Sequence, residues 1–188
     1  MQRILKLIAV MPPEPVFSEI IRKQQFIADS WGPKHALRTP PHITLIPPMS
    51  LTSGEAGWLY GMAEALSSMF PPFKITLKDY GSFKPRVVFI NLLSSPELKD
   101  LQETWFEAVQ AKMPIVLEKY PDRPFHPHLT LAHKDVTRPQ FEQIWKFYET
   151  KKYDAIFPVN EFCILMHIEE GWVVERRYKL AEGRGHGA

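Results

Sequence analysis

The sequence predicts an α+β protein built from two similar lobes that share one cleft. Segments with the spacing of amphipathic helices alternate with short extended segments. Two extended segments, 73–83 and 87–92, are separated by a Lys-Pro turn, which is typical of an antiparallel hairpin. The pattern Pro-His-apolar-Thr-Leu occurs at 41–45 and again at 127–131, nearly half the chain length away. This internal period predicts a duplication in which each lobe contributes one motif strand to the cleft.

In the first half of the chain, apolar spacing predicts two strands and two helices. The opening run of Ile, Leu and Val is bounded by prolines and is interpreted as a buried strand, not as a signal peptide. The first motif strand is expected to end at Pro47 and Pro48, because proline cannot donate to a strand ladder. The second helix is expected to start near Ser53. The expected strands cover 4–11 and 42–46, and the expected helices 13–30 and 50–70.

The second half continues with the hairpin, two helices and two closing strands. A turn or loop is expected at 121–124, before the second motif strand. The closing strands are expected to break near Pro158 and to be joined by a Glu-Glu-Gly turn. A polar tail is expected at 181–188. The remaining helices are expected at 95–112 and 138–149, and the closing strands at 153–168 and 172–180.

Each expected helix has one apolar side. In the first helix, Gln24 is predicted to lie on the polar side with Arg22 and Lys23. In the third helix, Ser95 is the predicted N-cap and Pro96 the first helical residue. The apolar residues expected to face inward are Val16, Ile20, Ile21 and Phe26 in the first helix, Trp58, Leu59, Met62, Leu66 and Met69 in the second, Leu98, Leu101, Trp105 and Val109 in the third, and Phe141, Ile144, Trp145 and Tyr148 in the fourth.

The two motif strands carry the residues with the clearest chemistry. Successive side chains of a strand point to opposite faces, so His42 and Thr44 share one face while the apolar residues between and after them share the other. The same alternation places His128 and Thr130 together. Two such strands side by side would surround one phosphate group with two imidazoles and two hydroxyls.

Composition restricts the classes of function. With 188 residues, 45% of them hydrophobic, the chain is long enough for one domain or two closely packed lobes. The 23 Lys and Arg residues exceed the 21 Asp and Glu residues by only two. This small excess argues against extended nucleic-acid binding and is compatible with a small anionic ligand. The single Cys163 excludes an intramolecular disulfide and favours a cytoplasmic location, and no apolar run is long enough for a membrane span.

On the two His-x-Thr-Leu tetrapeptides, the chain resembles the 2H phosphoesterases, in the branch of 2′-5′ RNA ligase-like (LigT-like) proteins and cyclic nucleotide phosphodiesterases. The resemblance implies a bilobal α+β fold, with two antiparallel β-sheets lining a central cleft and helices packed outside. It also implies a cyclic phosphodiesterase or 2′-5′ phosphoesterase that works without a metal or cofactor on nucleotides or RNA ends. His42 and His128 would be the acid and base, and Thr44 and Thr130 would bind phosphate oxygens.

The residues agree with this implied mechanism. Opening a cyclic phosphate needs a base on one side and an acid on the other, and histidine serves as either near neutral pH. The threonine hydroxyls can donate hydrogen bonds to the nonbridging oxygens. Many LigT-like proteins have an Arg shortly after the second Thr, where this chain has Ala132-His133-Lys134. This departure affects the expected substrate preference.

Several other residues are weaker candidates for the site. His126 is two residues before His128 and is predicted to face the same cleft, and Tyr178 on the last strand is predicted to contact substrate. Further candidates are Arg38 and Lys84 for phosphate contacts, Phe83 and Trp31 for base stacking, and His126, His128 and His133 as an alternative zinc set.

Two alternative functions remain open from sequence. One is a noncatalytic nucleotide-binding module of the same fold, and the other is 2′-5′ RNA ligase activity. The expected partner is a small nucleotide or RNA-end substrate, with no membrane and no obligate protein partner, and the chain is expected to be a monomer. His35, His167 and His186 are interpreted as structural or solvent-facing.

Overall fold

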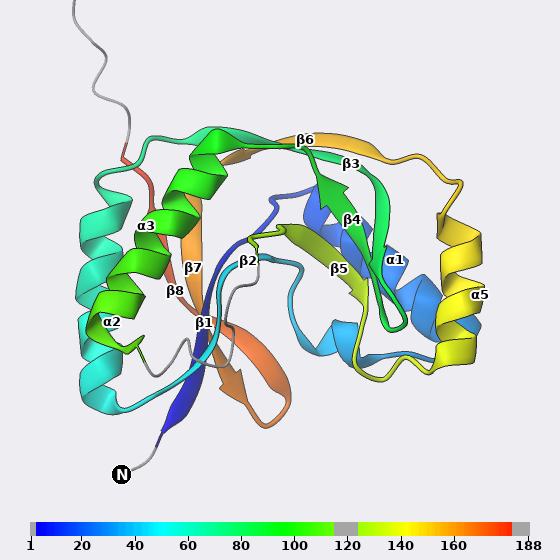
Figure 1. Ribbon diagram of the computed structural model, residues 1–188, viewed down its shortest axis with the longest axis horizontal. Coiled ribbons are helices and arrows are strands. Elements are labelled where there is room, and N and C mark those ends of the chain that lie inside the picture. The colour runs from blue at the N-terminus through cyan, green and yellow to red at the C-terminus, as the bar shows by residue number, and fades with distance from the viewer. Residues whose placement is uncertain (1–2, 115–123, 182–188) are drawn as a thin grey trace, which may run out of the picture.

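The computed structural model, which describes residues 3–114 and 124–181, contains two four-stranded antiparallel sheets (Figure 1). The first sheet has the strand order β2-β1-β7-β8 and the second the order β5-β4-β3-β6. The α+β fold with two antiparallel sheets, predicted from the sequence, is confirmed. The strands are β1 Ile4–Val10, β2 Ile43–Leu51, β3 Phe73–Phe83, β4 Val87–Leu92, β5 His128–Ala132, β6 Asp154–Val159, β7 Glu161–Ile168 and β8 Gly171–Lys179.

Helices cover the sheets, and two of them cross from one sheet to the other. Helix α1 follows β1 of the first sheet but packs on β5 of the second, beside α5. Helix α3 follows β4 of the second sheet but packs on β2 of the first, which α2 also covers. The two halves therefore exchange a helix, and each motif strand contacts the helix of the opposite half. The helices are α1 Val16–Trp31, the 3₁₀ helix η1 His35–Arg38, α2 Ser53–Ser67, α3 Pro96–Lys112 and α5 Arg138–Tyr148.

Local signals account for where these helices begin. Ser95 accepts a hydrogen bond from the amide of Leu98, so it is the N-cap of α3, with Pro96 in the first turn as expected. Thr52 and Glu55 form a capping box at the start of α2. The predicted apolar stripe of α3 is buried as a unit and includes Leu98, Leu101, Trp105 and Val109.

Some expected boundaries and faces are wrong. Strand β2 continues through Pro47 and Pro48, because it is an edge strand and the prolines lie between the paired positions Ile8–Ile46 and Lys6–Met49. The closing strands break at Asn160, close to the break expected near Pro158, and Pro158 itself lies inside the edge strand β6. Side chains expected to face inward but found exposed are Ile21, Phe26 and Met69.

Gln24 is the largest exception to the expected helix faces. Its side chain is only 3% exposed, although the sequence pattern places it with the charged residues of α1. The buried position follows from the crossing of α1 onto β5. The turn expected at 121–124 falls mostly outside the described residues, as does the tail after Ala181.

Candidate active site

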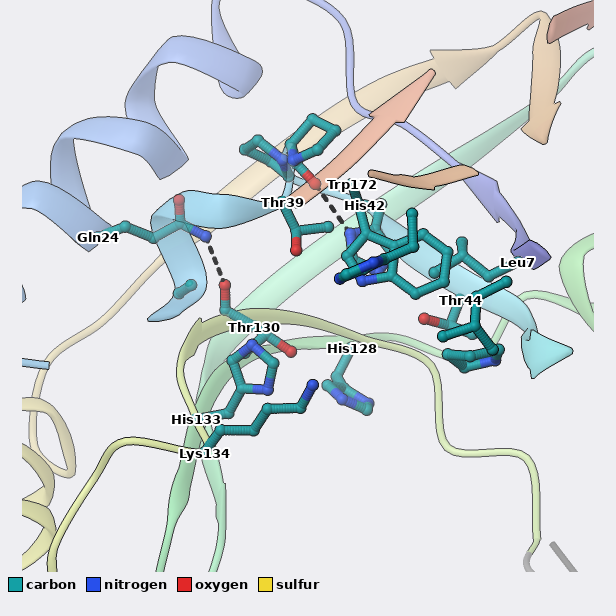
Figure 2. A pocket seen from close by; sticks show the side chains of 16 residues that line it. Leu7, Gln24, Thr39, His42, Thr44, His128, Thr130, His133, Lys134 and Trp172 are labelled. Carbon is teal, nitrogen blue, oxygen red and sulfur yellow. Dashed lines mark hydrogen bonds between the residues drawn. The ribbon is translucent and has the colours of Figure 1, made fainter. Parts of the chain in front are cut away.

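The two motif strands meet at a cleft of about 520 Å³. His42, Thr44, His128 and Thr130 all line it, as Figure 2 shows. The apolar neighbours Ile43 and Leu129 are fully buried on the other side of their strands. The alternation predicted from the sequence therefore brings two imidazoles and two hydroxyls to one cavity. Strand pairing supports this arrangement, because β2 and β5 are edge strands and each has one side free to meet the other.

Each motif histidine is oriented by a backbone carbonyl two residues before it. Nδ1 of His42 lies 2.8 Å from the oxygen of Pro40, and Nδ1 of His128 lies 2.7 Å from the oxygen of His126. A carbonyl oxygen can only accept, so each Nδ1 carries the proton and donates it. In the neutral ring this leaves the lone pair on Nε2, where it can accept a proton from a reacting group.

The electrostatics of the cleft favour the neutral form of both motif histidines. Burial lowers the pKa of His42, the carbonyl of Pro40 partly counteracts this, and the nearby His128 lowers it further. Burial also lowers the pKa of His128, with a smaller opposing effect from its hydrogen bond to His126. A bound anion would raise both pKa values, because a negative charge favours the imidazolium form.

Gln24 connects α1 to the second motif. Its Nε2 donates a 2.9 Å hydrogen bond to the backbone oxygen of Thr130, and its side chain also lines the cleft (Figure 2). Strand β5 lies at a sheet edge, and this hydrogen bond gives the backbone oxygen of Thr130 a donor from α1. Sequence reasoning missed this residue, because its burial depends on a helix crossing between lobes.

The loop after β5 adds two further cleft residues that are not in the motifs, His133 and Lys134. Burial, with the nearby His35 and Lys134, lowers the pKa of His133 to about 4. The rings of His133 and His35 meet edge-on, with centroids 4.9 Å apart. Lys134 has a φ of 63°, a left-handed conformation that is rare for residues other than Gly, Asn and Asp. The Asp135 carboxylate holds this loop by accepting from the amides of Lys34 and His35 at 2.7 and 2.9 Å.

Other predicted contacts lie away from the cleft. Tyr178 is buried, stacks on Phe162 with ring centroids 5.5 Å apart and is not among the residues that line the cleft, so its substrate contact stays a prediction. His126 lines a neighbouring hollow and packs edge-on against Phe83, and its contribution to the cleft is the carbonyl that orients His128. Trp31 packs against Phe26 and Phe147, and Lys84 lines a separate hollow beside α5.

The alternative zinc set does not converge. His133 packs on His35, whereas His126 packs on Phe83 and lines the neighbouring hollow. Within residues 3–114 and 124–181, no group of three or more His, Cys, Asp or Glu side chains is placed to hold a metal ion. In the same residues, no helix is both long enough and apolar enough to cross a membrane. Cys163 is buried.

The fold and the cleft define a class of protein in which two His-Thr pairs on two neighbouring strands face one cleft. The family model of the 2′-5′ RNA ligase superfamily matches residues 12–171, and the chain belongs to this family. A Bacillus licheniformis protein named as a phosphoesterase is 30% identical over 85% of this chain and 93% of its own length. A Bacillus pumilus relative with the same kind of name is 28% identical over 86% and 93%. Membership and these relatives support an enzyme of the phosphoesterase kind.

Solved structures share the fold across nearly the whole chain. The Thermus thermophilus protein TT0787 has a TM-score of 0.71 and 21% identity, covering 95% of this chain and 99% of its own. E. coli LigT in its apo form has a TM-score of 0.66 and 20% identity, covering 97% and 100%. At these identities the likeness concerns the fold.

Proposed function

We propose that this protein hydrolyses the 2′,3′-cyclic phosphate of nucleotides or RNA ends to a phosphomonoester, with His42 and His128 as the acid/base pair. The observation that carries the proposal is the matched orientation of the two imidazoles. Both line one cleft, and both donate Nδ1–H to a carbonyl at 2.7–2.8 Å, which leaves Nε2 for chemistry. The same proton acceptor and donor chemistry is therefore available from each lobe.

In the proposed reaction, one neutral imidazole accepts a proton from water as the water oxygen attacks phosphorus. The bond between phosphorus and the ribose O3′ breaks, and the other histidine, as imidazolium, gives its proton to that oxygen. The product is a 2′-phosphate, and the two histidines have exchanged protonation states. Between turnovers, the histidine that acted as base releases its proton to solvent, and the histidine that acted as acid takes one up.

Thr44 and Thr130 are the proposed donors to the nonbridging oxygens. Each lies two residues after its histidine, on the same face of its strand, and each lines the cleft. Donors fixed before the reaction stabilise the charge that accumulates on these oxygens in the transition state. E. coli LigT has been crystallised in complexes with phosphate and with 3′-AMP, which supports a phosphate-bearing nucleotide as the ligand of this fold.

The test is phosphomonoester release from 2′,3′-cyclic AMP in the presence of EDTA. His42→Ala and His128→Ala are each expected to lower kcat by about 10²- to 10⁴-fold, the usual contribution of a general acid or base. His126→Ala is the matched control, because it removes a neighbouring imidazole but keeps the carbonyl that orients His128. It should retain most of the activity.

Three results would contradict the proposal. Loss of wild-type turnover in EDTA would favour a metal-dependent reaction. Equal activity of His42→Ala and wild type would remove the paired-histidine mechanism. A folded wild-type protein that leaves cyclic AMP unchanged but cleaves 2′-5′-linked dinucleotides would move the substrate from cyclic phosphates to that linkage.

A further inference from the structure

One wall of the cleft is apolar and comes from the opposite end of the chain. Trp172, the second residue of β8, lines the cavity together with Leu5 and Leu7 of β1 and shares it with His42 and Thr44 (Figure 2). Trp172 is partly buried, and its inner side packs on a small core of Leu7, Ala9, Cys163 and Leu165. Leu5 is 40% exposed although it faces the cavity. The wall therefore presents aromatic and aliphatic surface beside a polar reaction centre.

A clamp fixes the turn that carries Trp172. The guanidinium of Arg38, at the end of η1, donates to the backbone oxygens of Glu169 and Glu170 at 2.8 and 3.1 Å. Next to these residues, Gly171 has a φ of 147° and approaches Arg38 so closely that a Cβ atom would lie 2.1 Å from the Arg38 carbonyl oxygen. Contact at this distance requires glycine. Arg38, considered above as a phosphate contact, therefore holds the β7–β8 turn against η1.

The indole is also held from the side. The ring of His167, which pairs with Trp172 across the β7–β8 hairpin, meets it edge-on with centroids 5.1 Å apart. A rigid aromatic ring costs little conformational entropy when a ligand binds. Because no Asp or Glu of the described residues lines the cleft, an electron-rich or anionic ligand meets none of their carboxylates there.

We infer that Trp172 is a stacking platform for the nucleobase of the substrate and that Arg38 is the residue that positions it. This inference rests on the proposed function, because it places the base on the apolar wall while the phosphate lies between the His-Thr pairs. Stacking accepts any base, since every base has a π face. The platform therefore selects nucleotides over cyclic phosphates that lack a base, and it does not select one base.

The test compares 2′,3′-cyclic AMP with glycerol 1,2-cyclic phosphate, which has the same reacting group and no base. Trp172→Leu keeps apolar volume without a π face and is expected to lower kcat/KM for cyclic AMP by about 10- to 100-fold, the effect of removing a base–aromatic contact. The kcat/KM for the glycerol substrate should stay within about twofold. Trp172→Phe should restore most of the difference, because it restores an aromatic face.

Arg38→Ala tests the positioning role with the same pair of substrates. It should lower the preference for cyclic AMP over the glycerol substrate, whereas a purely structural residue would lower both rates together. Trp145→Leu is the control, because Trp145 is a partly buried tryptophan on α5 that lines a hollow outside the cleft. Its substrate preference should match wild type.

The inference would be overturned if Trp172→Leu lowered kcat/KM equally for both substrates. It would also be overturned if the variant kept the wild-type preference for cyclic AMP over the glycerol substrate. If wild type hydrolyses neither substrate, the proposed function fails. Measurements of ligand affinity then test the stacking platform independently of hydrolysis. Wild type should then bind 2′-AMP more tightly than inorganic phosphate, and Trp172→Leu should lose that advantage. Equal affinities of wild type for the two ligands would exclude the stacking platform.

Discussion

The side-chain amide of Gln24 donates a 2.9 Å hydrogen bond to the backbone oxygen of Thr130, across the boundary between the two halves of the fold. Thr130 follows His128 in the second motif, so a helix that begins next to β1 of the first sheet holds a motif strand of the second. The arrangement couples the position of the proposed oxyanion donor to the packing of α1. It also explains why a polar residue is buried in a helix whose neighbouring positions are charged.

Gln24→Leu should lower both stability and kcat. The carbonyl of Thr130 loses its donor, and leaving such a group unsatisfied costs about 1–3 kcal/mol. The loss is partly offset, because Oε1 of Gln24 has no hydrogen-bond partner among the described residues and is removed as well. Chemical denaturation and initial rates on a cyclic nucleotide measure the two effects. Gln25→Leu is the matched control, since Gln25 is exposed and bonds to Asp29 within the helix; equal rates in both variants would contradict the coupling.

The motif residues could be predicted from sequence because their arrangement depends on a strand period of two. That period alone places His42 and Thr44 on one face, and the contact between β2 and β5 brings His128 and Thr130 to the same cleft. Gln24 could not be found in this way, since its burial depends on which sheet α1 packs against. The position of Tyr178 could not be predicted either. Alternation along β8 does not reveal that the ring of Tyr178 is covered by Phe162.

The remaining cleft residues depend on loop conformation. The tripeptide Ala132-His133-Lys134 is visible in the sequence as a departure from the usual Arg, but the left-handed backbone of Lys134 is not. The position of Trp172 depends on the contact between Arg38 and the β7–β8 turn, which joins residues more than 130 positions apart. No short-range pattern in the sequence predicts contacts between residues so far apart.

Lys134→Met should raise KM for a cyclic nucleotide by about 3- to 10-fold. Lys134 supplies the only permanent positive charge among the described side chains that line the cleft, and a phosphodiester carries one negative charge. The effect should be modest because Lys134 is exposed and water and salt screen the attraction. KM of wild type should rise with ionic strength more steeply than KM of the variant.

Lys134→Arg should keep KM near the wild-type value, since it keeps the charge. Lys74→Met is the control for net charge, because Lys74 is an exposed residue of β3 that does not line the cleft. If Lys74→Met and Lys134→Met raise KM equally, the effect is one of overall charge, and the position of Lys134 has no special importance.

The pH dependence of catalysis should reflect the lowered pKa values of His42 and His128. The acid must be protonated, and its pKa in the free protein lies below the ordinary value of 6.5, so kcat/KM should fall as pH rises through the range below and around 6.5. In the substrate complex the phosphate charge raises the pKa of the imidazolium, so the basic limb of kcat should lie at higher pH. Initial rates at several substrate concentrations between pH 4.5 and 8.5, a range of about four units around the ordinary histidine pKa, give both profiles. A kcat/KM that is constant up to pH 8, about 1.5 units above that pKa, would contradict this assignment.

Gly81→Ala should destabilise the protein and impair His128. A Cβ atom at Gly81 would lie 2.5 Å from the ring of Phe89 and 2.6 Å from Oδ1 of Asn91. Phe89 is 2% exposed and its ring centroid lies 4.8 Å from that of His128, so the ring cannot move outward and would press on the proposed catalytic imidazole. Overpacking of this kind costs about 1–3 kcal/mol.

The measurement is thermal unfolding together with kcat, with Gly57→Ala as the control. Gly57 lies inside α2, and a Cβ atom added there would meet no described atom within 4 Å, so alanine should stabilise the helix by about 0.5–1 kcal/mol. Gly81→Ala should lower Tm by several degrees, since about 1 kcal/mol corresponds to roughly 2–4 °C at this chain length. An unchanged Tm with reduced kcat would mean that Phe89 yields toward His128 at little energetic cost, whereas wild-type values of both would show that the contact between Gly81 and Phe89 constrains neither the fold nor the histidine.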